Sequence, residues 1–205
     1  MKIDILVEEP SMKGFLEPVL PKIIFPPDTW SIHVLSCFKT KLEKRLRGFT
    51  HQDPGKYRII IISDLDRKDC REMKQWLEDI VHRAGLHTKT NPHLDGSYSV
   101  ITRLAIQELE SWILGDFHAI HAVYSRVPET LGTHTKYKTP DNVGNTWESL
   151  HALLKKGGYC GDIYPKIEVA RKVASHIDPH MNQSQSFQIF LQGLNTLLSS
   201  SSPST

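Results

Sequence analysis

The apolar residues of this 205-residue chain follow two patterns over its first half, short uninterrupted runs and longer stretches with helical spacing. Four consecutive isoleucines at 59–62 form the strongest run, which is typical of a strand buried on both faces of a parallel sheet. Strands are predicted over residues 2–7, 31–38, 58–63 and 98–106. Helices are predicted over residues 11–23, 39–47, 69–84 and 108–114. This alternation predicts an α/β fold with a mostly parallel sheet flanked by helices.

The second half of the chain carries only helical spacing. Apolar residues recur with that spacing over residues 143–154, 166–175 and 184–198. We therefore predict an α/β domain over residues 1–125 and a helical C-terminal extension over residues 126–198 that packs on it. Residues 199–205 are mostly serine and cannot bury apolar surface, so they are predicted to be a disordered tail.

Two polar residues are placed to cap predicted helices. Ser11 stands at the start of the first predicted helix, and its hydroxyl oxygen can accept a hydrogen bond from a free backbone N–H of the first turn. Asp69 and Glu72 have the spacing of a capping box, with Asp in place of Ser or Thr. Asp69 is therefore predicted to cap a helix rather than to bind a metal.

Carboxylates follow two of the predicted strands. Glu8 ends the first strand, and Asp64 and Asp66 follow the isoleucine strand. The carboxyl ends of parallel strands meet at one edge of the sheet, where open α/β sheets bind ligands. Crowded carboxylates repel one another unless a divalent cation lies among them. This pattern predicts a Mg²⁺ (or Mn²⁺) site with Asp64 and Asp66 as ligands and Glu8 as a ligand or general base, which suits phosphodiester cleavage. A polar turn after a buried strand often contains aspartates, so spacing alone also allows a site without metal.

Further charged residues lie in or after the fourth predicted strand. Glu108 and Glu110 open the next helix at the same edge, and either could complete the metal site. The alternative is that the helix dipole alone favours carboxylates in this first turn. Arg103 lies within the strand and is a candidate to neutralise a bound phosphate, or else to pair with a neighbouring carboxylate.

Only local groups of basic residues, and not the net charge, indicate nucleic acid as a partner. The net charge of +2 does not by itself indicate nucleic acid. A basic run within residues 39–47 is more specific, and its candidate phosphate contacts are Lys39, Lys41, Lys44 and Arg45. The alternative for this run is a solvated helix face. Arg171 is a further candidate, because it belongs to a polar cluster that precedes the last predicted helix.

Composition also bears on the environment of the chain. No apolar run approaches the roughly 20 residues that cross a membrane, so no membrane span is expected. The three cysteines are odd in number and have no paired metal spacing. A reduced, cytoplasmic setting is the simplest interpretation.

These motifs together resemble a known family. The Toprim domain of primases, topoisomerases and overcoming-lysogenization-defect nucleases carries a Glu after its first strand and an Asp-x-Asp after its third, and Glu8 and Asp64-Leu65-Asp66 match this signature. More closely, the chain resembles a bacterial Toprim-like family of unknown function, domain-of-unknown-function family 4276. The matching segments are residues 6–13, 64–70, 107–116 and 176–187.

The resemblance implies a Mg²⁺-dependent nuclease that acts on nucleic acid, with an ATPase partner protein in a phage-defence or mobile-element setting. One departure is Glu9, which stands where most Toprim domains have Gly. Another is Asp69-Cys70, where these domains tend to have Gly. A catalytically degenerate adaptor or nucleic-acid-binding module is therefore the main alternative. A phosphatase with Asp64 as nucleophile is less well supported, because Lys68 stands where Thr or Val is usual. The choice of DNA or RNA and the oligomeric state stay open.

Overall fold

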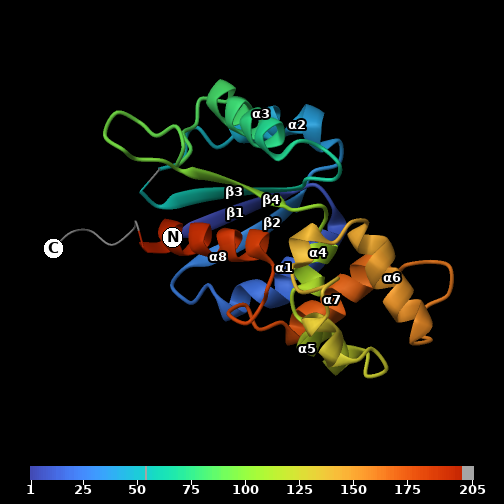
Figure 1. The fold of residues 1–205 in the computed structure, drawn as a ribbon. Coiled ribbons are helices and arrows are strands. Elements are labelled where there is room, and N and C mark those ends of the chain that lie inside the picture. The colour runs from blue at the N-terminus through green and yellow to red at the C-terminus, as the bar shows by residue number, and fades with distance from the viewer. Residues whose placement is uncertain (54, 200–205) are drawn as a thin grey trace.

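Four parallel strands form one sheet in the computed structural model, which describes residues 1–53 and 55–199 (Figure 1). The strands are β1 (Lys2–Val7), β2 (Thr29–Val34), β3 (Tyr57–Asp64) and β4 (Val100–Ala105), in the order β2-β1-β3-β4. The helices are α1 (Pro10–Val19), α2 (Phe38–Arg47), α3 (Cys70–Arg83), α4 (Glu110–Leu114), α5 (Phe117–Val123), α6 (Thr146–Lys156), α7 (Lys166–His176) and α8 (Gln185–Ser199). Short 3-10 helices are η1 (Leu20–Lys22), η2 (Glu129–Thr133) and η3 (Pro140–Asn142). The predicted α/β fold with a parallel sheet flanked by helices is confirmed.

The strand order places the helices on opposite faces of the sheet. The chain moves outward from β1 to β2 and then returns past β1 to β3 and β4. Because β-α-β crossovers are right-handed, this reversal places α1 on one face and α2 and α3 on the other, as Figure 1 shows. The chain leaves the carboxyl ends of β1 and β3 toward opposite faces of the sheet, and ligands bind at such switch points in open α/β sheets.

Alternate residues of the isoleucine strand face two separate hydrophobic cores. Ile60 and Ile62 pack in the core formed with α1, α4, α5, α7 and α8. Ile59 and Ile61 pack in the core under α2 and α3. Side chains of a strand point alternately to its two faces, so a strand covered on both sides needs an apolar residue at every position.

The helical second half completes the larger core. Helices α6, α7 and α8 contribute buried residues, among them Leu150, Val173 and Phe187, to the same cluster as Ile3 and Phe15 of the first half. The boundary near residue 125 stays a prediction, but the two halves share one core. Apart from Ser199, the predicted disordered tail lies outside the described residues.

Several element boundaries differ from the predictions for local reasons. The first helix begins at Pro10, a residue suited to a first helical turn, so Ser11 lies inside the helix and donates to Glu9 Oε2 at 3.1 Å. The prediction that Ser11 caps this helix is wrong. The second strand ends at Val34 rather than 38, because α2 already begins at Phe38. Within the described residues, no helix has both the length and the apolar character needed to cross a bilayer.

Candidate active site

Glu8 and Asp64, the first two predicted site residues, lie where β1 and β3 end. Val7 pairs with Ile62 in the parallel register, so the next residues along the two strands, Glu8 and Ser63, are neighbours. The Ser63 hydroxyl donates a hydrogen bond to Glu8 Oε2 at 2.9 Å. This bond holds the Glu8 carboxylate beside Ser63, whose side chain faces the opposite side of the sheet from that of Asp64, because successive side chains of a strand alternate. Glu9 is among the charges close to Asp64.

Asp64 lies at the centre of the cluster. Its Oδ1 atom is shielded from solvent and has no hydrogen-bond partner among the described residues. Burial raises the pKa of the Asp64 carboxyl well above its usual value, and the nearby charges of Glu110, Glu9, Asp66 and Glu108 raise it further. The site therefore concentrates negative charge around a buried carboxyl that lacks a partner.

The structure brings Glu108 and Glu110 to this edge, as their position after β4 suggested. Glu108 Oε2 accepts hydrogen bonds from the Thr146 hydroxyl at 2.7 Å and from the Trp147 backbone N–H at 3.2 Å, so it caps the first turn of α6. Glu110 is only 2% exposed, and burial raises its pKa to about 7. Its carboxyl therefore changes charge near neutral pH.

Three residues with unusual backbone geometry line one cleft beside these carboxylates. Asp66, Gln107 and Asn145 have φ values of 55°, 61° and 50°, in the left-handed region that residues other than glycine rarely adopt. The Asp66 N–H donates to the Gln107 carbonyl at 2.7 Å, so two of these residues hold each other in place. Such local strain is common at functional sites.

The cleft has a volume of about 350 Å³ and a charged lining. Asp66, Glu108 and Glu148 supply carboxylates, and Arg67 and Lys68 supply cations. Lys68 Nζ pairs with Asp66 Oδ2 at 2.7 Å. Glu148 Oε2 is shielded from solvent and, within residues 1–53 and 55–199, has no hydrogen-bond partner.

The C-terminal extension adds a cation and a tyrosine to the site. Lys166, the first residue of α7, lies 3.9 Å from Glu9 Oε2. Burial lowers the pKa of Lys166, but Glu110, Glu9, Glu108 and Asp64 raise it by more, so its pKa lies above its usual value. Tyr164 lies beside Glu110, and burial raises the pKa of its hydroxyl. The cluster is therefore built from both halves of the chain.

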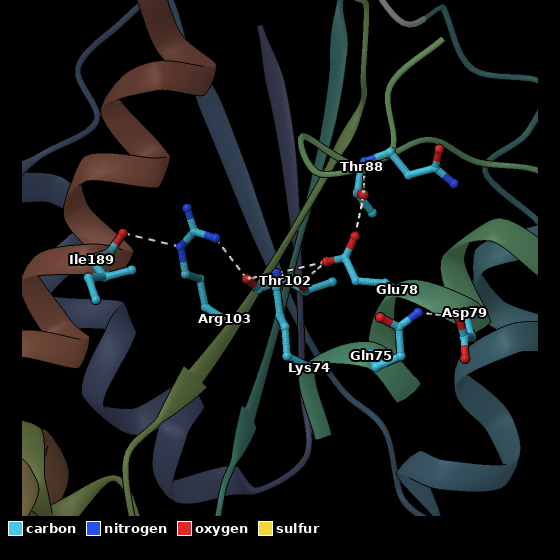
Figure 2. Close-up of polar contacts among 9 residues, drawn as sticks. Lys74, Gln75, Glu78, Asp79, Thr88, Thr102, Arg103 and Ile189 are labelled. Atoms are coloured by element: carbon cyan, nitrogen blue, oxygen red, sulfur yellow. Dashed lines mark hydrogen bonds and ion pairs between the residues drawn. The ribbon is translucent and has the colours of Figure 1, made fainter. Parts of the chain in front are cut away.

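Arg103 does not lie with these carboxylates. Figure 2 shows it at the outer edge of β4, where its Nε donates to the Ile189 carbonyl of α8 at 3.1 Å and its Nη1 donates to the Thr102 carbonyl at 2.7 Å. On the other side of Thr102, Lys74 pairs with Glu78 at 2.7 Å. Lys74 Nζ also donates to the Thr102 carbonyl at 3.1 Å, so these contacts connect α8, β4 and α3.

The other candidate cations are exposed on helices. Lys39, Lys41, Lys44 and Arg45 lie on the solvent side of α2, whose buried side is formed by Phe38, Leu42 and Leu46. Arg171 lies on α7 and pairs with Glu17 of α1 at 3.7 Å. Asn182 and Ser184, which precede α8, are buried and make hydrogen bonds to Trp112 and Asp141. The role of Arg171 as a phosphate contact stays a prediction.

Asp69 caps α3, as predicted, because its Oδ1 accepts from the N–H groups of Arg71 and Glu72. In the part of the chain that the structure describes, no three His, Cys, Asp or Glu side chains are already arranged to hold a metal ion. The bare Asp64 Oδ1 atom nevertheless fits a cation, because a divalent ion would supply the partner that it lacks.

Sequence reasoning does not identify Glu9, Glu148, Tyr164 or Lys166 as site residues. Glu9 stands out in the sequence only as a departure from the Toprim pattern, although two adjacent glutamates at the end of a strand are a visible signal. Tyr164 and Lys166 have no such signal, because they reach the site only through the packing of α7 on α1.

Comparisons with known proteins bear on the family and, in one solved structure, on the fold. A family profile described as "Domain of unknown function (DUF4276)" matches residues 7–195. The structure is similar to the C-terminal region of the Burkholderia pseudomallei OLD protein, with a TM-score of 0.53 and 16% identity over 95% of this chain and 98% of that one. The C-terminal region of the Xanthomonas campestris pv. campestris OLD protein gives a TM-score of 0.47 and 16% identity over 97% of this chain and 96% of that one. The curated proteins contain no match.

Proposed function

The chain belongs to the DUF4276 family and has a Toprim-like fold, and from that premise we propose that it is a divalent-metal-dependent nuclease. The observation that carries this proposal is the Asp64 carboxyl, whose Oδ1 atom is shielded from solvent and lacks a hydrogen-bond partner among the described residues, and which is surrounded by four other carboxyl groups at the switch point of the sheet. Only a proton or a cation can stabilise such an arrangement, and a divalent cation suits oxygen ligands.

We propose Asp64, Asp66 and Glu8 as metal ligands, with Glu108 and Glu110 as accessory ligands. Glu108 already uses one oxygen to cap α6, which leaves its other oxygen for the cleft. When bound, Mg²⁺ or Mn²⁺ would polarise a phosphate oxygen and lower the pKa of a bound water.

The residues around the metal ligands have separate roles in this proposal. Glu8 is oriented by Ser63 and can accept a proton from water as general base. Lys166 is the cation best placed to contact a phosphate, since its Nζ lies 3.9 Å from Glu9 at the rim of the same cluster. The basic side of α2 begins just after the carboxyl end of β2 and would contact the nucleic-acid backbone.

Cleavage assays on single-stranded DNA, double-stranded DNA and RNA test this function. We expect cleavage with Mn²⁺ or Mg²⁺, none with a chelator, and a loss of at least about 100-fold in Asp64→Asn. Asp79→Asn is the matched control, because Asp79 is an exposed carboxylate on α3 that bonds only to Gln75 in the described chain. Cleavage by Asp64→Asn at the wild-type rate would overturn the proposal.

The alternative of a catalytically degenerate adaptor makes a different prediction. An adaptor would bind nucleic acid or a partner protein without cleaving any of the three substrates. The ATPase partner and the phage-defence setting rest on the family resemblance alone. Co-purification with an ATPase encoded beside this gene, followed by the same assays on the complex, tests them.

A further inference from the structure

The outer backbone of the sheet is bonded at one edge. The order of the strands places β2 at one edge and β4 at the other. On β4, the Val100 N–H donates to the His87 carbonyl at 3.1 Å. The Thr102 carbonyl accepts from Lys74 Nζ at 3.1 Å and from Arg103 Nη1 at 2.7 Å, as Figure 2 shows. At Val100 and Thr102, therefore, backbone groups that could pair with a further strand are already used within the chain.

The outer backbone of β2 has no such bonds. The N–H groups of Thr29 and Leu35 donate to carbonyls on the β1 side, both at 2.9 Å. Because the hydrogen-bonding groups of a strand point alternately to its two sides, those of Trp30, Ile32 and Val34 point away from β1. Within residues 1–53 and 55–199, these outward N–H and C=O groups have no hydrogen-bond partner. All residues of β2 are at least partly exposed, so this open edge, formed by Trp30, Ile32 and Val34, is accessible along its length.

The side chains beside the open edge differ between the two faces of the sheet. On one face, the side chains of the open-edge residues pack against the core that α1 covers and stay partly exposed. On the other face, Arg45 Nη2 of α2 lies 3.4 Å from His33 Nδ1, and Lys41 Nζ lies 3.2 Å from the Ser36 hydroxyl just after β2. Neither Arg45 nor Lys41 pairs with a carboxylate of the described chain. Two cations without a counter-charge therefore lie beside the strand.

We propose that the open edge of β2 binds an extended segment of a partner protein, which adds a strand to the sheet. In such pairing, main-chain hydrogen bonds give affinity and alternate side chains give specificity. The flanking residues favour a segment that alternates apolar residues with Asp or Glu, because its side chains would meet the apolar face and the α2 cations in turn. A second copy of this chain is a poorer partner, since twofold pairing of β2 with β2 would bring like charges of the two α2 helices together.

Amide hydrogen exchange of the full chain, measured by NMR, tests this pairing. The probe is a short synthetic peptide that alternates Glu with Val, and the control peptide alternates Lys with Val. In the free protein, amides of the open edge should exchange rapidly, whereas those of Ser31 and His33 should exchange slowly because they face β1. The Glu-Val peptide at saturation should slow exchange at the open edge by about tenfold or more, and the Lys-Val peptide should leave it unchanged.

A charge variant tests the choice of partner. Replacing Lys41 and Arg45 together with Gln should weaken binding of the Glu-Val peptide by about two- to thirtyfold, the range expected for two exposed ion pairs. Arg47→Gln is the matched control on the same helix, because Arg47 already pairs with Glu43 at 2.8 Å. Peptide titrations followed by NMR chemical shifts measure both affinities.

Each outcome bears on one part of the inference. Unchanged exchange at the open edge with the Glu-Val peptide would overturn the strand pairing. Equal slowing by the two peptides, or equal affinity of the double variant and Arg47→Gln, would overturn the acidic partner. Slowing that grows with protein concentration in the absence of peptide would show that a second copy occupies the edge instead. None of these measurements depends on cleavage, so the nuclease proposal stands or falls separately.

Discussion

The protonation of Glu110 should be visible in the stability of the protein. Its pKa is about 7 in the folded protein against 4.5 for an unperturbed glutamate, because it is buried. The folded state therefore keeps a proton that the unfolded chain has lost between these pH values. The free energy of unfolding should fall as pH rises from about 4.5 to about 7, by up to roughly 3 kcal/mol.

Glu110→Gln should remove the part of this pH dependence that Glu110 contributes, while the raised pKa of Asp64 should still lower stability as pH rises. Urea unfolding at a series of pH values between 4.5 and 8, in the presence of a chelator, measures it, with Asp79→Asn as the control. An identical pH slope in Glu110→Gln and in the wild type would contradict the buried, protonated state of Glu110. Added Mn²⁺ should raise stability most above pH 7, where the carboxylates are free to bind it.

The two adjacent glutamates after β1 should differ in their effect on cleavage. Glu8 is oriented by Ser63, whereas Glu9 accepts from Ser11 and lies near Lys166. Glu8→Gln should therefore lower the cleavage rate by about 100-fold or more, the contribution expected of a general base. Glu9→Gln should lower the cleavage rate less, because Glu9 is a neighbour of Lys166 and not the proposed general base. Single-turnover rates of both variants on one substrate decide this, and a larger loss from Glu9→Gln would reverse the assignment.

At the scale of elements, α2 is the candidate contact for the nucleic-acid backbone. Lys41, Lys44 and Arg45 are exposed and form no ion pairs among the described residues, so their charges are free to meet phosphates. Replacing all three with Gln should weaken binding and lower the slope of log affinity against log salt. The slope should fall by about 0.7 to 0.9 for each phosphate that the variant no longer neutralises.

Fluorescence anisotropy across a salt series measures that slope. Arg47→Gln is the control on the same helix, because Arg47 already pairs with Glu43 at 2.8 Å. An unchanged slope in the triple variant would mean that the exposed side of α2 is only a solvated helix face. The binding surface would then have to be found elsewhere in the chain.

At the scale of the whole molecule, Gly115 joins the two halves of the chain. It ends α4, and its carbonyl accepts from the Gln183 N–H at 2.8 Å. A Cβ atom at Gly115 would lie only 2.0 Å from Asn182 Oδ1. Asn182 is buried and bonds to the Trp112 carbonyl and the Ser184 N–H, so it can move only by losing those hydrogen bonds.

Gly115→Ala should therefore destabilise the protein by about 1 to 3 kcal/mol, the usual range for overpacking a core. Gly144→Ala is the control, since a Cβ atom there meets nothing within 4 Å. Urea unfolding monitored by tryptophan fluorescence measures both variants. If Gly115→Ala and Gly144→Ala have the same free energy of unfolding, the two halves of the chain can shift to make room for a Cβ atom at residue 115. The packing around Asn182 would then be less rigid than its hydrogen bonds imply.

The sequence by itself determined the sheet, its faces and part of the site. Four isoleucines at 59–62 require a strand covered on both sides, and Asp69 and Glu72 set the start of α3. The position of Asp64 after that strand was enough to predict a carboxylate cluster, because parallel strands bring their carboxyl ends to one edge. These are local signals, carried by residues close together in the chain.

Only the tertiary structure decided which other residues join the cluster. Lys166 and Tyr164 come from the second half of the chain and reach Glu110 and Glu9 through packing between α1 and α7. Arg103, equally basic, is instead turned to the outer edge of β4 by its bonds to Ile189 and Thr102. Which side chains from distant parts of the chain reach the site depends on how the helices pack, and no local sequence pattern determines that packing.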